Sequence, residues 1–210
     1  MPREREVLDV DVLFVGAGPA SLAGAIRLMQ LQGEHNRKAS GSGKGGKVEL
    51  MAAVIEKSAG LGFHNLSGAI LDPRAMDSLM PGWRAQGAPV EAVVTSHEVR
   101  WLTRRGSVVA PITPPPLANK GCALVSLSRF TKWMGEKAEA LGADIFDHFP
   151  AAELIWDGGR VAGVRCRDSG RDKAGGEKEG VEPGAEIRAR VAGPGGGTRG
   201  PPTPNRGVQQ

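Results

Sequence analysis

Residues 9–30 read DVDVLFVGAGPASLAGAIRLMQ, and this stretch decides the fold. Its first seven residues form a short apolar run rich in β-branched side chains, which is typical of a strand buried on both faces of a parallel sheet. A glycine turn follows. Apolar residues then recur at helical spacing up to about Gln32, at Leu22, Ala25, Ile26 and Met29. Such a turn lets the backbone approach a pyrophosphate closely, and the positive end of the helix dipole then faces the phosphates.

A second strand is predicted over residues 48–56 (VELMAAVIE), so strand, turn, helix and strand make one βαβ unit. Residues 33–47 contain five glycines, four Lys or Arg and no large apolar side chain, which predicts a flexible surface loop. Glu56 ends the second strand and would accept hydrogen bonds from the hydroxyls of the adenosine ribose; the alternative is a solvated acid at a strand end. The loop accounts for a separation from the turn longer than the usual ~20 residues.

The turn departs from the pattern G-x-G-x-x-G at its third position, which is Ser21. The usual glycine permits close packing of the helix on the strand, and serine, a small polar residue, is compatible with binding if the helix is slightly displaced. The motif is weak alone, but here it follows a strand and opens a helix, as a dinucleotide site requires. The predicted cofactor-binding residues of this unit are Gly16, Ala17, Gly18, Pro19, Ala20, Ser21, Glu56 and Lys57.

The later part of the chain favours FAD over NAD. An NAD-binding fold would continue as alternating βα units, whereas here a hairpin signal, Asp157-Gly158-Gly159, follows the second strand by about 100 residues. We therefore predict an α/β fold: a Rossmann-like FAD/NAD(P)-binding core of the glutathione-reductase-like type with a β-hairpin or meander, incomplete at its C-terminus. Its other predicted elements are a helix at 126–141 that stops at Gly142, strands at 143–146, 152–156, 161–167 and 186–191, and a polar loop at 171–180.

Composition excludes several classes of protein. The net charge is +4, but the basic residues are spread among 23 acids, so we expect a mostly solvated surface and no nucleic-acid partner. The two cysteines, Cys122 and Cys166, cannot build a disulfide scaffold or a four-cysteine cluster, and no metal site is predicted. The first residues, MPREREVLDV, show no targeting peptide, and no run of 18 apolar residues predicts a membrane-spanning helix.

Five stretches of the chain resemble the family of electron transfer flavoprotein–ubiquinone oxidoreductases. The second is the most discriminating, because generic flavoprotein monooxygenases lack its HxLSGAxLDP pattern after the Glu-Lys turn. The likeness runs from about Val10 to Val191. The stretches are VGAGPASLAGAIRLMQL (15–31), VIEKSAGLGFHNLSGAILDPRAMDSLMPGW (54–83), GAPVEAVVTSHEVRWLT (87–103), SRFTKWMGEKAEALGADIF (128–146) and GGRVAGVRCRD (158–168).

The resemblance implies an oxidoreductase whose FAD is reduced by electron transfer flavoprotein. It also implies a [4Fe–4S] cluster in the full-length protein and delivery of electrons to ubiquinone. Such a protein is peripheral on the inner membrane, at the bacterial cytoplasmic face or the mitochondrial matrix face. By position, Gly16, Gly18, Ser21 and Glu56 match the adenosine-diphosphate site. A loop that lies toward the flavin ring is matched by His64, Leu66, Ser67 and Gly68.

No catalytic residue is assigned. His64 invites an acid–base role, but electron transfer through a flavin needs no protein nucleophile, so we expect it to pack or to contact the flavin. Cys122 and Cys166 match none of the family's cluster cysteines, which lie near the C-terminus of the full-length protein.

The stretch 63–83 matches a segment that the family lays into the bilayer without crossing it. Its apolar residues suit that placement, while Asp72, Arg74 and Asp77 would have to face headgroups. A helix packed on the domain is the alternative. The apolar residues are Leu66, Ile70, Leu71, Met76, Leu79, Met80 and Trp83.

The likeness to the family ends inside a predicted core strand, at Val191. We therefore predict a partial FAD-binding domain over 8–191 and a disordered Gly/Pro-rich tail over 192–210, as in a truncated or frame-shifted form with doubtful activity. Two alternatives stay open. One is another FAD-dependent oxidoreductase, geranylgeranyl-reductase-like or a nitrogen-fixation-type flavoprotein dehydrogenase; the other is an inactive fragment that is not an enzyme.

Overall fold

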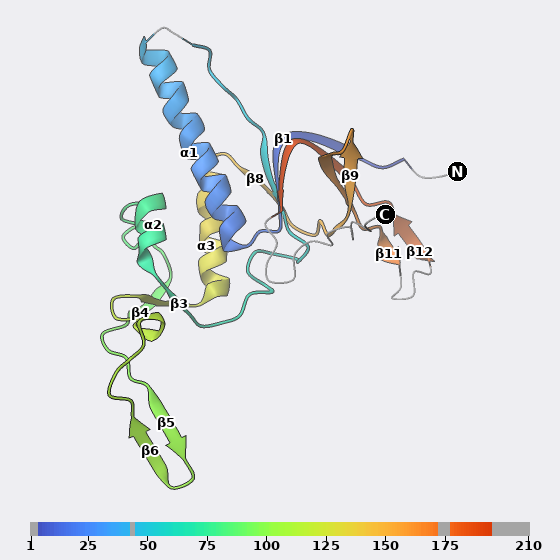
Figure 1. The fold of residues 1–210 in the computed structure, drawn as a ribbon. Helices are drawn as coiled ribbons and strands as arrows, with labels where there is room; N and C mark the ends of the chain where they lie inside the picture. The colour runs from blue at the N-terminus through green and yellow to red at the C-terminus, as the bar shows by residue number, and fades with distance from the viewer. Residues whose placement is uncertain (1–3, 43–44, 172–176, 195–210) are drawn as a thin grey trace, which may run out of the picture. The chain divides into compact units, whose positions relative to one another are not determined.

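The chain divides into two compact units (Figure 1). The computed structural model describes residues 4–42, 45–171 and 177–194. Unit 1 comprises Met1–Phe63 and Met134–Gln210, and unit 2 comprises His64–Trp133.

A six-stranded sheet forms the centre of unit 1, in the order β8-β2-β1-β13-β10-β9. The first four of these strands run parallel, as the βαβ pattern predicts, and β10 is antiparallel to both of its neighbours, β13 and β9. The strands β1 and β13 lie side by side although they come from opposite ends of the sequence (Figure 1). Val7 pairs with Glu186 and Val15 with Pro194. The bounds are β1 Val7–Val15, β2 Ala52–Ile55, β8 Asp144–Phe146, β9 Ala151–Asp157, β10 Arg160–Cys166 and β13 Glu186–Pro194.

Two helices contribute to the core of unit 1. The helix α1 (Pro19–Ser42) buries Leu22, Ala25, Ile26 and Met29, the apolar stripe predicted from the sequence. The helix α3 (Leu127–Ala140) begins in unit 2 and its second half belongs to unit 1, where Met134 and Ala138 are buried. Gly142 follows α3 at a φ of 98°, so the predicted C-terminal stop is confirmed.

The predicted loop over 33–47 is wrong in its first part, because α1 continues to Ser42. Glu, Arg, Lys and Ala favour helix, and each of the two glycines in this part, Gly33 and Gly41, costs only about 1 kcal/mol. The extended helix also has polar partners: Asn36 donates through Nδ2 to the carbonyl of Val48 and accepts through Oδ1 from its N–H, both at 2.8 Å. Gln32 Oε1 accepts from the N–H of Leu50. The strand expected from Val48 therefore begins later, at Ala52.

The predicted hairpin is confirmed, since β9 and β10 pair around Gly158 and Gly159, both at positive φ. The polar loop expected at 171–180 is partly strand: β11 (Ser169–Arg171) pairs with β12 (Glu177–Glu182), and residues 172–176 lie outside the described residues. The strand expected at 186–191 continues to Pro194. Three residues of the expected disordered tail are therefore strand, and residues 195–210 lie outside the described residues.

Unit 2 is built on a three-stranded antiparallel sheet, in the order β3-β7-β4, with a separate two-stranded hairpin, β5–β6 (Figure 1). Its core contains Trp83 and Phe130, whose rings meet edge to face at 5.8 Å, and Trp133 packs on Phe130. The bounds are β3 Ala69–Leu71, α2 Pro73–Leu79, β4 Val90–Val93, β5 Arg100–Thr103, β6 Gly106–Val109, the 3₁₀ helix Pro115–Leu117 and β7 Ala123–Val125.

The segment 63–83 has two different parts. Met76, Met80 and Trp83 are buried, and the indole N–H of Trp83 donates to Asp77 Oδ1 at 2.7 Å, so the second part packs as a helix within unit 2. Of the remaining apolar residues, Leu66 and Ile70 are exposed. Among the described helices, none combines the length and hydropathy that crossing a bilayer requires.

Candidate functional site

The glycine turn joins β1 to α1 at the carboxyl end of the parallel strands. Gly16 adopts a φ of 93°, a conformation that favours glycine, and its N–H donates to the carbonyl of Ile55 on β2 at 2.8 Å. Pro19 is the first residue of α1, a position where its missing N–H costs no helical hydrogen bond. The first backbone N–H groups of α1 have no partner inside the helix, so this turn presents a local positive potential to an anion.

Glu56 lies directly against this turn. Its Oε2 accepts a hydrogen bond from the N–H of Ala17 at 3.0 Å, and its Oε1 accepts from the N–H and the hydroxyl of Ser58 at 3.0 and 2.8 Å. Its main chain is also held, because its N–H donates to the carbonyl of Phe146 and its carbonyl accepts from Phe149, both at 2.8 Å. The acid predicted to face a ribose is therefore fixed in place next to the predicted phosphate turn.

Ser58 was not predicted from the sequence. It is buried, and its hydroxyl lies 2.8 Å from both Glu56 Oε1 and the carbonyl oxygen of Gly60. The only signal in the sequence is a small polar residue two positions after the strand-end acid, in a turn that also contains Gly60 and Gly62. That signal is too common to have identified the contact.

Ser21, at the third motif position, is buried, and its hydroxyl has no hydrogen-bond partner within the described part of the chain. A buried hydroxyl that makes no hydrogen bond destabilises the fold. Serine in place of the usual glycine therefore lowers the stability of the fold at this position, while Gly16 keeps its positive φ.

The predicted site residues fall into two groups. Gly16 to Ser21 and Glu56 come together in unit 1, and Lys57 follows them with an exposed side chain. The second predicted group, His64, Leu66, Ser67 and Gly68, is exposed and belongs to unit 2.

Within unit 2, sequence analysis missed Asn65, which anchors the second group of predicted residues. Its side-chain amide donates to the hydroxyl of Thr131, a fully buried residue of α3. Gly68 closes this stretch at a φ of 81°. The loop from His64 to Gly68 is therefore fixed at Asn65, while its other side chains stay open to solvent.

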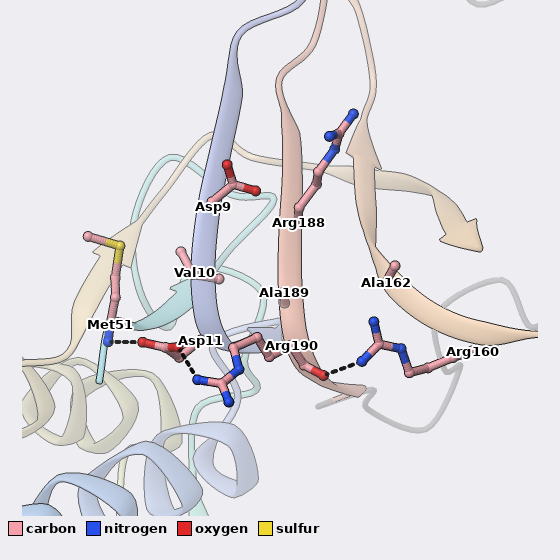
Figure 2. A pocket seen from close by; sticks show the side chains of 9 residues that line it. All are labelled: Asp9, Val10, Asp11, Met51, Arg160, Ala162, Arg188, Ala189 and Arg190. Atoms are coloured by element: carbon pink, nitrogen blue, oxygen red, sulfur yellow. Dashed lines mark hydrogen bonds and ion pairs between the residues drawn. The ribbon is translucent and has the colours of Figure 1, made fainter. Parts of the chain in front are cut away.

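A charged hollow of about 400 Å³ lies on the strands β1, β13 and β10, at the amino-terminal half of β1 and away from the glycine turn (Figure 2). Asp11, one of its lining residues, accepts from the N–H of Met51 at 3.0 Å and from Arg190 Nη1 at 3.1 Å. The Met51 hydrogen bond, and then the Arg190 guanidinium, hold the pKa of Asp11 below its usual value. Asp11 thus ties β13 to the segment before β2, which is a structural role. The lining residues are Asp9, Val10, Asp11, Met51, Arg160, Ala162, Arg188, Ala189 and Arg190.

The residues present do not fit a [4Fe–4S] cluster. The sequence has two cysteines, and the described residues contain no group of three or more His, Cys, Asp or Glu that could hold a metal ion. Cys166 is buried in the sheet core, where loss of hydration raises the pKa of its thiol to about 11. It is therefore a protonated core residue at neutral pH.

The fold is a Rossmann-like fold of the kind that FAD-dependent oxidoreductases share. The predicted fold class is confirmed by solved structures at 16 and 18% identity, which show the fold alone. A geranylgeranyl bacteriochlorophyll reductase-like protein from Thermoplasma acidophilum matches at a TM-score of 0.53 and 18% identity, over 89% of this chain and 38% of that one. The flavin-dependent monooxygenase PieE, solved with FAD and substrate, matches at a TM-score of 0.54 and 16% identity, over 92% of this chain and 31% of that one. No family model matches the chain.

Curated relatives are more specific. The chain is 40% identical over 188 residues to the mitochondrial electron transfer flavoprotein–ubiquinone oxidoreductase of Arabidopsis thaliana, covering 89% of this chain and 28% of that protein. The Sus scrofa protein of the same name is 40% identical over 190 residues, which cover 90% and 29%. These matches confirm the predicted resemblance. The chain spans less than a third of the length of these relatives.

Proposed function

We propose that unit 1 binds the adenosine-diphosphate half of FAD, with the phosphates at the glycine turn and the ribose at Glu56. The observation that supports this proposal most is the hydrogen bond between Ala17 N–H and Glu56 Oε2, because it holds a strand-end carboxylate beside the glycine turn of one βαβ unit. The positive end of α1 faces the phosphates, and the positive φ of Gly16 lets the backbone approach them. FAD, when bound, supplies a ring that accepts electrons and passes them on.

FAD titration of the purified protein tests this proposal. Gly18→Glu puts a side chain and a negative charge into the turn, so we expect the Kd for FAD to rise at least about tenfold. Gly33→Glu is the matched control, because a Cβ at Gly33 meets no atom within 4 Å and the position lies further along α1. We expect it to bind FAD like the parent. Absence of binding in the parent, or equal loss in both variants, contradicts the proposal.

We propose further that the chain serves an oxidoreductase that takes electrons from reduced electron transfer flavoprotein and delivers them to ubiquinone. Support comes from the 40% identity to relatives of that name over nine tenths of the chain. Anaerobic, reduced electron transfer flavoprotein should pass its electrons to the oxidised flavin bound to this chain, so that, once the two proteins are separated, this chain carries a reduced flavin and electron transfer flavoprotein an oxidised one. A flavin that stays oxidised would contradict this assignment and leave the FAD-binding proposal intact.

We also propose that unit 2 contacts a membrane surface, and that the β5–β6 hairpin is the contact. Large apolar residues of its two strands are exposed to solvent: Trp101 is 60% exposed, Leu102 83% and Val108 57%. Arg104 and Arg105 lie at its turn, where they suit anionic headgroups. Peripheral association with the inner membrane would follow. Trp83 belongs to the segment 63–83, for which both a bilayer placement and packing on the domain stood open, and its side chain is fully buried.

Liposome co-sedimentation tests the membrane contact. Replacing Trp101 and Leu102 with Ser should release the protein from vesicles that contain anionic lipid, because both apolar side chains would leave the lipid. Leu31→Ser with Val48→Ser is the matched control, since these residues are also exposed but lie in unit 1. Equal sedimentation of the hairpin variant and the control would contradict a contact through the hairpin.

A further inference from the structure

We propose that Ser58 is a positioning residue for the adenosine ribose and acts through Glu56; this inference rests on the proposed FAD site in unit 1. Ser58 lies two residues after Glu56 and is 6% exposed. Its N–H and its hydroxyl both donate to the same carboxylate oxygen, Glu56 Oε1, at 3.0 and 2.8 Å. Its own carbonyl accepts from the N–H of His148 at 3.0 Å, so the residue is held in its turn.

The two oxygens of Glu56 are held from different elements. Oε1 is held by Ser58 in the turn after β2, and Oε2 by the N–H of Ala17 in the turn after β1. Together these contacts fix the plane of the carboxylate relative to the phosphate turn. A carboxylate oriented before the ligand arrives has less side-chain freedom to lose on binding, and the ligand is bound more tightly as a result.

The hydroxyl of Ser58 has one proton and two acceptors. Glu56 Oε1 and the carbonyl of Gly60 both lie 2.8 Å from Oγ, so only one of them receives the proton at any moment. The charged acceptor is the stronger one, which favours Glu56. The carbonyl of Gly60 keeps the hydroxyl paired when a ribose hydroxyl competes for Oε1. The geometry thus suits a ligand that carries ribose hydroxyls next to a diphosphate.

Ligand pairs that differ in the ribose hydroxyls separate this role from a structural one. The ligands are FAD, ADP and 2′,3′-dideoxy-ADP, and their Kd values are measured by calorimetry for the parent, Ser58→Ala, Glu56→Gln and the double variant. We expect Ser58→Ala to weaken FAD and ADP binding about five- to tenfold. In the Glu56→Gln protein the same change should cost less than about twofold, because Ser58 acts through the carboxylate.

Two further variants serve as controls on shape and folding. Ser58→Cys keeps nearly the same shape with a weak donor, so it carries the test if Ser58→Ala lowers the melting temperature, and Ser58→Thr should restore binding. Ser96→Ala, at an exposed position of unit 2, should bind all ligands like the parent.

The outcomes are distinct. The inference is supported if Ser58→Ala weakens the binding of FAD and ADP but changes the Kd of 2′,3′-dideoxy-ADP little. It also requires that the double variant bind no more weakly than Glu56→Gln alone. Equal weakening for the dideoxy ligand, additive losses in the double variant, or no weakening overturns it while the FAD site stands. A parent protein that binds neither FAD nor ADP overturns the proposed function, and the role of Ser58 with it.

Discussion

The β1–α1 region and the β5–β6 hairpin use the same kinds of apolar residue and place them differently. In the first, Leu13 is fully buried in the sheet core, and Leu22 and Ile26 of α1 are fully buried as well. In the second, Trp101 and Val108 face each other across the strands and remain largely exposed, as does Leu102. An isolated two-stranded hairpin is marginal in water. The comparison teaches that the first region gains its stability by burying apolar side chains within the chain, whereas the second leaves its apolar side chains exposed.

The same glycine substitution should affect the six-stranded sheet of unit 1, which contains β1, and the β5–β6 hairpin very differently, and this is the largest effect we expect. A Cβ at Gly163 in β10 would lie 2.1 Å from the carbonyl oxygen of Ile187, and its φ of 155° disfavours other residues. Gly163→Ala should therefore cost more than about 3 kcal/mol or prevent folding, since the obstacle is backbone.

Gly106→Ala in β6 is its matched control, because a Cβ there meets no atom within 4 Å. Chemical denaturation should show a change below about 0.5 kcal/mol. Similar losses for both glycine variants would break the comparison.

Leucine truncation should separate the regions by a smaller amount. Leu13→Ala removes a fully buried side chain from the sheet core and should lower the free energy of unfolding by about 3 kcal/mol. Leu102→Ala removes a side chain that is 83% exposed, and it should change the free energy of unfolding by less than about 0.5 kcal/mol. Urea unfolding measures both, and a large loss for Leu102 would mean that the hairpin is part of a core.

The βαβ unit was predictable because its signals are local. The strand at 9–15, the turn at Gly16 and the apolar stripe of the first helix each follow from a few neighbouring residues. The length of α1 could not be predicted in the same way, because Gly33 suggested that the helix ends there. Asn36 and Gln32 hydrogen-bond to Val48 and Leu50, which only the folded chain brings close.

The contacts that complete the candidate site were hidden for a similar reason. Ser58 faces Glu56 through the geometry of one turn, and Asn65 meets Thr131 across 66 residues of sequence. The burial of Trp83 likewise depends on its packing against Phe130, which no pattern within residues 63–83 indicates.

The buried cysteine gives a pH-dependent effect in the sheet. Burial raises the pKa of Cys166 to about 11, so the unfolded chain loses this proton at lower pH than the folded one. The free energy of unfolding therefore keeps its full value below about pH 9. It falls by about 2 kcal/mol as the pH rises to about 11.

Denaturation at pH 8 and pH 10.5 measures this loss, with Cys166→Ala as the control that removes the thiol. The parent should lose more stability than the variant between the two pH values. Parallel losses would mean that the thiol is hydrated.

The smallest effect concerns Ser21. Its buried hydroxyl lacks a partner within the described part of the chain, so Ser21→Ala should raise the free energy of unfolding by about 1 kcal/mol. Ser40→Ala, on the exposed side of the same helix, should change it by only a few tenths. A loss of stability on Ser21→Ala would show that the hydroxyl does make a hydrogen bond in solution.

Hydrogen exchange with and without FAD tests the central claim most directly, because it locates binding along the chain. We expect FAD to slow amide exchange at residues 16–22 and 56–60, where the turn, the start of α1 and the turn after Glu56 would hold the adenosine diphosphate. Exchange in the β5–β6 hairpin at residues 100–109 should stay unchanged. No slowing at the glycine turn in the presence of saturating FAD, or slowing confined to the hairpin, would contradict the account.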